Sequence, residues 1–108
     1  MIVVIIGGGA SGFFSAITCA TQNKKAKVII LEKTDKLLAK VRISGGGRCN
    51  VTNACQSTQE FASNYPRGKD FLIEAFKTFN NKDIIEWFRK RNVSLKAEPD
   101  GRMFPTSD

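Results

Sequence analysis

Histidine is absent from the 108 residues of the sequence. This absence excludes a histidine-based catalytic triad and a histidine-ligated metal site within the chain. Cysteine occurs only at Cys19, Cys49 and Cys55, an odd number without CxxC spacing. Such cysteines predict reduced thiols in the cytoplasm rather than the disulfide framework of a secreted protein. No apolar run reaches membrane-spanning length, so we expect no membrane association.

Acidic side chains are also scarce, with 10 Asp and Glu against 17 Lys and Arg, which gives a formal net charge of +7. Residues 33–50 hold five of the basic residues and one aspartate. For the charge alone, a solvated basic face is the preferred interpretation, and an anionic ligand near residues 33–50 is the alternative. The composition, 42% hydrophobic and 25% charged, is that of an ordinary globular protein.

The apolar pattern predicts a strand, a helix and a second strand in the first part of the chain. Residues 2–6, IVVII, form a continuous apolar run that is typical of a parallel strand covered on both faces. A helical stripe of apolar residues runs from Ala10 to about residue 22, and residues 27–32, KVIILE, predict the second strand. This order predicts a right-handed βαβ unit of the α/β class, that is, a Rossmann-like unit.

The remainder of the chain predicts a loop, two helices and a hairpin. Residues 54–69 are mixed and polar, which indicates a loop, and apolar spacing predicts helices at 70–79 and at about 82–91. Phe71, Leu72 and Phe76 are expected on the buried face of the first helix. Asn80 and Asn81 are candidate caps of the second helix, which is expected to bury residues 84, 85 and 88 and to end at a left-handed residue 92. A strand at 93–97, the turn EPDG and a return at 102–104 complete the prediction.

A dinucleotide-binding turn is indicated between the first strand and helix, where Gly7, Gly9 and Gly12 have GxGxxG spacing and Glu32 follows twenty residues later. The first glycine permits the tight turn, the second lets a pyrophosphate approach the backbone, and the third allows close helix packing. Glu32 would accept hydrogen bonds from a ribose and would repel a 2′-phosphate, which leaves NAD and FAD. The alternative is a plain turn with a surface acid.

A second glycine run lies in KVRISGGGRCNVTN, residues 40–53. A run of glycine indicates backbone that bends unusually or lies close to a ligand. Its N–H groups could face phosphate oxygens. Arg48 has two open roles, as a pyrophosphate counter-charge or in a structural salt bridge. Cys49 and Cys55 are separated by five residues rather than the four of flavin disulfide reductases, so we do not expect a redox disulfide.

Four segments together, GGGASG at 7–12, LEK at 31–33, RISGGGRCNVTN at 42–53 and DGRMFPTSD at 100–108, resemble the HI0933-like (BaiN and YhiN type) NAD(P)/FAD-dependent oxidoreductases. The resemblance implies FAD as cofactor, NAD(P)H as reductant and a small organic substrate, of which a conjugated enone is one candidate. It places the ADP half of FAD on Gly7, Gly9, Ala10, Ser11, Gly12 and Glu32. Further contacts along the cofactor are implied for Lys33, Ser44, Gly45, Gly46, Gly47, Arg48, Cys49 and Asn50.

The resemblance also implies a longer protein, because members of this family are several hundred residues long. The chain is therefore expected to be the N-terminal part of one FAD-binding domain, with the βαβ unit and glycine run in 1–53 and the helical pair and hairpin in 54–108. Two parallel strands are too few to bury their own faces, so the rest of the polypeptide is an expected partner. No catalytic residue is assigned, and the 108 residues alone are expected to be inactive.

Two alternatives from other classes stay open at this point. One is a dinucleotide-binding module with a structural, sensory or RNA-modification-associated role and no hydride chemistry of its own. The other is a basic nucleic-acid binder, which the spaced glycine motif disfavours.

Overall fold

The computed structural model describes residues 1–107, which divide into two compact units. The first unit comprises residues 1–47, and the second begins at Arg48. No helix among the described residues has the length and apolar character needed to cross a membrane.

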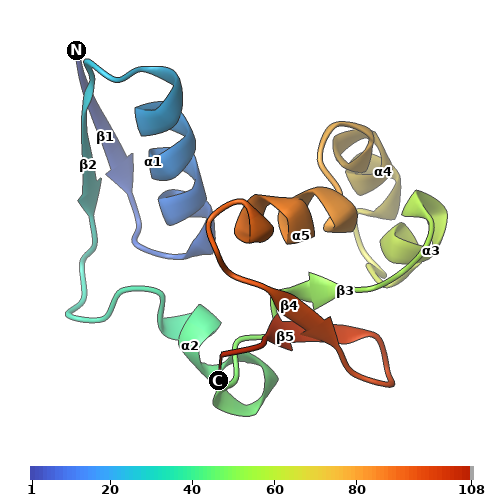
Figure 1. The fold of residues 1–108 in the computed structure, drawn as a ribbon. Helices are drawn as coiled ribbons and strands as arrows, with labels where there is room; N and C mark the ends of the chain where they lie inside the picture. The colour runs from blue at the N-terminus through green and yellow to red at the C-terminus, as the bar shows by residue number, and fades with distance from the viewer. Residues whose placement is uncertain (108) are drawn as a thin grey trace. The chain divides into compact units, whose positions relative to one another are not determined.

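The first unit is built around two parallel strands joined by a helix (Figure 1). Strand β1 (Ile2–Ile6) pairs with β2 (Lys27–Leu31), with Ile2 opposite Lys27 and Ile6 opposite Leu31, and helix α1 (Ala10–Gln22) forms the connection between them. The predicted βαβ unit is thereby confirmed.

Only one face of β1 is covered within the described residues. Val3 and Ile5 are half-buried, whereas the exposed fractions of Ile2 and Ile6 are 66% and 80%. An alternating pattern of burial therefore replaces the two-sided burial that the continuous apolar run predicted. The reason is that α1 packs on one face of the pair, and no described element of this unit covers the other.

The glycine run ends a short helix, α2 (Ala39–Gly47), which the sequence did not predict. The helix is interrupted at Ser44, where ψ is 149°, and Gly45 and Gly46 then have left-handed φ angles of 59° and 73°. Gly47 also has a positive φ, of 90°. Three successive positive φ angles are accessible to glycine and strained for other residues, which accounts for the run and confirms the unusual bend that it predicted.

The second unit contains a three-stranded antiparallel sheet in the order β3 (Thr52–Asn53), β5 (Arg102–Pro105), β4 (Leu95–Ala97). The predicted hairpin is confirmed, since Gly101 N donates to Glu98 O at 2.9 Å and closes the EPDG turn. Strand β3 was not predicted, because two residues are too few to show an alternating pattern.

Three helices complete the second unit: α3 (Thr58–Ser63), α4 (Lys69–Thr78) and α5 (Asn81–Arg89). Helix α3 corrects the prediction of a loop across residues 54–69. It begins at Ser57, whose hydroxyl accepts a hydrogen bond from Glu60 N at 3.1 Å, and its six residues are too short for an apolar stripe. The predicted α4 and α5 are confirmed, with Asn80 as the N-cap of α5 and a left-handed Asn92 after it.

Burial in the second unit is concentrated on Phe104, Phe61, Ala62 and Met103. Helix α4 contacts α3 through Phe76, whose ring centroid lies 4.7 Å from that of Phe61. The prediction that Phe71 belongs to the buried face of α4 is wrong for this unit, because its exposed fraction is 79%. Residues 84, 85 and 88 of α5 are half-buried rather than buried.

Candidate dinucleotide-binding site

The turn between β1 and α1 depends on two of the predicted glycines. Gly7 has φ of 104°, and its N–H donates to Leu31 O at the end of β2 at 2.7 Å. A Cβ on Gly12 would lie 2.0 Å from Gly7 O, which is far inside contact distance. The turn thus requires glycine at position 7 for its conformation and at position 12 for the close approach of α1.

Gly9 has a different environment, because a Cβ there would meet no heavy atom of the chain within 4 Å. Gly9 is the extended N-cap of α1, makes no side-chain cap hydrogen bond, and is followed by exposed Ala10 and Ser11. The first N–H groups of a helix have no intrahelical partner, and no acid lies in the first turn of α1. The space beside Gly9 is therefore open and lies at a helix terminus that favours an anion.

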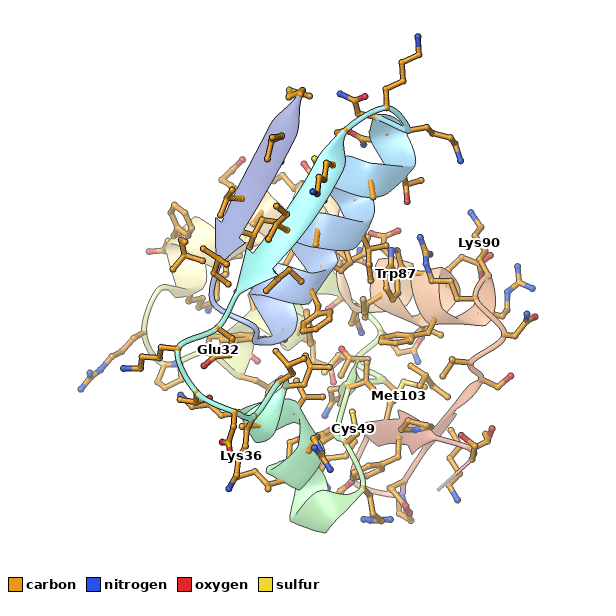
Figure 2. All side chains as sticks on the ribbon, turned by 90° about the vertical axis from the view of Figure 1, so that its left-hand side faces the viewer. Glu32, Lys36, Cys49, Trp87, Lys90 and Met103 are labelled. Atoms are coloured by element: carbon orange, nitrogen blue, oxygen red, sulfur yellow. The ribbon has the colours of Figure 1, made fainter. Side chains whose placement is uncertain are left out.

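Glu32 lies just after β2, beside this turn (Figure 2). Its Oε1 accepts a hydrogen bond from Gly8 N at 3.0 Å, and its Oε2 accepts from Thr34 N at 2.8 Å and Thr34 Oγ1 at 2.7 Å. The bond from Gly8 is the largest cause that lowers the pKa of Glu32 to about 2, followed by those from Thr34. The acid is therefore ionised at neutral pH and held against the turn.

The carboxylate of Glu32 retains acceptor capacity toward a ligand. A carboxylate offers about four acceptor positions, and the donors found among residues 1–107 leave room at Oε1 for one more hydrogen bond. A ribose hydroxyl is a donor of the required kind. Lys33 follows Glu32 and is exposed.

Two residues that bind Glu32, Gly8 and Thr34, were not among the site residues predicted from the sequence. Gly8 supplies the N–H that binds Glu32, and a Cβ on Gly8 would lie 2.7 Å from Leu37 Cδ2 and 3.2 Å from Glu32 Cβ. Thr34 binds the same carboxylate from the other side. The available signals were the middle glycine of GGG and a hydroxyl residue two positions after the acid.

The second glycine run was predicted to contact the cofactor. Residues 44–47 of this prediction lie in the first unit. Ser44 Oγ donates to Val41 O at 2.8 Å, so its hydroxyl satisfies a backbone carbonyl of the short helix α2. Ser44 and Gly45 are half-buried, whereas Gly46 and Gly47 are exposed, and a Cβ on either exposed glycine would meet no heavy atom within 4 Å. The backbone there is accessible, and its contact with a cofactor stays a prediction.

The remaining predicted residues, Arg48, Cys49 and Asn50, lie in the second unit. Arg48 Nη1 forms an ion pair with Glu98 Oε1 at 2.9 Å, so the structural salt bridge left open by the sequence is present. Cys49 is half-buried with a φ of 62°, and burial raises the pKa of its thiol. All three cysteines are free thiols. Asn50 is exposed.

A cavity of about 450 Å³ in the second unit is lined mainly by asparagine and aromatic side chains. Several of these amides have structural hydrogen bonds. Asn81, 3% exposed, donates through Nδ2 to Asn53 O at 2.7 Å and Cys55 O at 2.9 Å, which fixes the end of β3 to α5. Asn80 caps α5, and Asn64 Nδ2 donates to Glu60 O at the end of α3. Asn64, Asn80 and Asn81 therefore stabilise the second unit. No group of three or more metal-ligating side chains occurs among the described residues.

The first unit has three features of the dinucleotide-binding α/β fold. They are a parallel βαβ unit, a glycine turn with an open helix terminus, and an acid at the end of the second strand. The model of the HI0933-like protein Rossmann domain matches residues 1–108. The chain therefore belongs to the HI0933-like family, as its sequence motifs indicated.

The chain is similar over nearly its whole length to several flavin- and RNA-related enzymes. The 3-dehydro-bile acid delta(4,6)-reductase of Clostridium scindens is 34% identical over 104 residues, which are 96% of this chain and 24% of that protein. The ribosomal RNA dihydrouridine synthase of Escherichia coli is 29% identical over 94% of this chain and 24% of that protein. The fumarate reductase flavoprotein subunit of Mycobacterium tuberculosis is 29% identical over 94% of this chain and 19% of that protein. The chain thus spans a quarter or less of the length of these relatives.

Proposed function

We propose that this chain is the FAD-binding segment of a flavin-dependent oxidoreductase. The observation that carries the proposal is the pairing of Glu32 with Gly8 N at 3.0 Å beside a helix terminus left open at Gly9. This arrangement suits the ribose and pyrophosphate of an adenine dinucleotide. Membership of the HI0933-like family and the similarity to a fumarate reductase flavoprotein subunit favour FAD over NAD at this position.

The residues of the glycine turn would bind and orient the cofactor. The main chain from Gly9 to Gly12 would donate to the pyrophosphate, and Glu32 would accept from the adenosine ribose. The backbone of Ser44–Gly47 would continue along the cofactor, with Lys33, Cys49 and Asn50 as further predicted contacts. Bound FAD would supply hydride chemistry, with NAD(P)H as the proposed reductant and a small organic molecule as acceptor.

The names of the relatives suggest one class of acceptor. A 3-dehydro bile acid with 4,6 unsaturation, the uracil ring and fumarate share a carbon–carbon double bond conjugated to a carbonyl or carboxyl group. We propose that the substrate of this protein carries such a bond, as a conjugated enone does, and that reduction saturates it. No described residue is assigned as the proton donor.

The exposed face of β1 and β2 supports a requirement for further polypeptide. Ile2, Ile6 and Leu31 are each more than half exposed, and such a sheet face is normally covered in an α/β protein. We propose that further segments of the same protein cover it.

The free thiols of all three cysteines support a cytoplasmic location.

The first experiment identifies the cofactor of the protein purified at its full natural length. Denaturation and chromatography should release stoichiometric FAD from the wild type and much less from Glu32→Arg, which loses the ribose acceptor. Recovery of FMN, NAD or no nucleotide from the wild type would overturn the proposal.

The second experiment tests hydride transfer. NADH and NADPH oxidation by the same preparation should depend on an added acceptor with a conjugated double bond, supplied as a steroid enone, fumarate or unmodified ribosomal RNA. Bound FAD without acceptor-dependent oxidation would favour the alternative function, a dinucleotide-binding module without hydride chemistry. Activity on ribosomal RNA alone would point to RNA modification, in line with the two dihydrouridine synthases among the relatives and the charge of +7.

A further inference from the structure

Arg48 makes two observed side-chain interactions in the second unit. Its guanidinium binds the carboxylate of Glu98 at 2.9 Å and lies 4.1 Å from the centroid of the Phe104 ring. Phe104 belongs to β5 and is only 1% exposed, so the ring provides a fixed surface beneath the cation. Glu98 begins the turn that joins β4 to β5, and its N–H donates to Arg102 O at 2.8 Å. Both partners of Arg48 therefore belong to the hydrogen-bonded β4–β5 hairpin.

The backbone just after Arg48 is bound to the same hairpin. Val51 N donates to Met103 O at 2.9 Å, and Ala54 N donates to Gly101 O at 2.8 Å. Thr52 lies opposite Met103 in the ladder between β3 and β5. Arg48 is thus the first residue at which the chain, leaving the glycine run, becomes fixed to an ordered element.

The three residues just before Arg48 are glycines, which have the greatest backbone freedom before they are ordered. Gly45, Gly46 and Gly47 have positive φ angles, and glycine loses more conformational freedom on ordering than any other residue. An anchor at the outgoing end of such a run lowers the entropy that ligand binding must remove. The guanidinium suits this task, since its planar fork binds a carboxylate and its face stacks on an aromatic ring.

We propose that Arg48 is a positioning residue that anchors the outgoing end of the glycine run to the β4–β5 hairpin through Glu98 and Phe104, and is not a counter-charge of the cofactor pyrophosphate. This inference rests on the proposed FAD binding. The two roles make opposite predictions for Glu98. If Arg48 is an anchor, then Glu98 contributes to FAD affinity. If Arg48 faces phosphate, then Glu98 competes for it.

The test compares FAD affinity among variants of the protein at its full natural length, by flavin fluorescence titration of the apo-protein. Arg48→Met and Glu98→Met should each weaken FAD binding about fivefold, as expected for an exposed ion pair supported by a cation–π contact. The double variant should be no weaker than Arg48→Met alone, because both substitutions remove one anchor. Arg48→Lys should weaken FAD binding nearly as much. A lysine ammonium keeps the positive charge, but it cannot stack on the Phe104 ring or bind a carboxylate through two parallel N–H groups as a guanidinium does.

Arg102→Met is the matched control. Arg102 lies on the same hairpin, pairs with Asp100 at 2.7 Å and lies 5.5 Å from the same ring, so its loss changes the net charge equally without touching the glycine run. It should leave FAD affinity unchanged. Unchanged or tighter binding in Glu98→Met, or near-wild-type binding in Arg48→Lys, would overturn the inference while leaving FAD binding intact. A wild type that binds no FAD would instead refute the proposed function.

Discussion

Replacing the second and third glycines of the GxGxxG motif, Gly9 and Gly12, separates the demands of the fold from those of the ligand. At Gly12 a Cβ would lie 2.0 Å from Gly7 O, so Gly12→Ala forces the helix away from the turn. Overpacking of this kind costs about 1–3 kcal/mol, and the better helix propensity of alanine returns up to about 1 kcal/mol. We expect Gly12→Ala to lower the free energy of unfolding of the apo-protein.

At Gly9 the same methyl group should act on the ligand instead. The backbone there has φ of −95° and ψ of −167°, which alanine adopts, and the added Cβ would meet no heavy atom within 4 Å. The apo-protein should therefore unfold as the wild type does, to within about 0.5 kcal/mol. If a pyrophosphate occupies this space, losing one charge-assisted contact costs about 1.5–3 kcal/mol, which is about a 10- to 100-fold weaker affinity for FAD.

The assay measures both quantities on both variants at full natural length, by urea unfolding of the apo-protein and by fluorescence titration with FAD. The reasoning predicts a stability loss in Gly12→Ala and an affinity loss without stability loss in Gly9→Ala. Wild-type FAD affinity in Gly9→Ala would refute the placement of the pyrophosphate beside the α1 terminus. Wild-type stability in Gly12→Ala would refute the close helix packing.

Three further predictions concern single groups. Asn81→Ala should lower the free energy of unfolding by about 2 kcal/mol in urea titrations, because it leaves the carbonyls of Asn53 and Cys55 without their donor; unchanged stability would show that water replaces the amide. The folded-state pKa of Glu32, about 2, lies below its ordinary value of 4.5, so its ionised form stabilises the fold above pH 4.5 and that stabilisation is lost as the pH falls toward about 2. The stability difference between wild type and Glu32→Gln should therefore be constant at neutral pH and shrink across that acid window, and a difference that instead changes between pH 6 and 8 would contradict the assignment. Thiol titration before and after NAD(P)H reduction should give equal counts; two additional thiols on reduction, absent in Cys49→Ser, would reveal a redox disulfide.

The parts of the fold that the sequence predicted are those specified by neighbouring residues. The βαβ unit, α4, α5 and the β4–β5 hairpin each have their own apolar pattern, cap or turn within a short stretch. For example, Asn80 accepts from Lys82 N and Asp83 N, which lie two and three positions along the chain. Such local signals are readable without knowledge of the tertiary structure.

The parts that escaped prediction depend on distant partners or on very short segments. Strand β3 exists because Thr52 and Asn53 pair with β5, about fifty residues later in the chain. The salt bridge between Arg48 and Glu98 likewise joins residues fifty positions apart, so the sequence could name Arg48 as a candidate without choosing its partner. Helix α3 has only six residues, and its local signals were limited to the capping Ser57 and to Glu60 in its first turn.

Gly8 shows how the two kinds of information meet at the candidate site. The GxGxxG pattern leaves its second position unspecified, because the tight turn, the approach of a pyrophosphate and the helix contact involve only positions 7, 9 and 12. In this chain a side chain at position 8 would press against Leu37 and Glu32, and the N–H of Gly8 is what binds the acid. A larger residue there would have to displace Leu37 or Glu32, even with the turn itself intact. The position of the Glu32 carboxylate therefore depends on a glycine that the motif does not require.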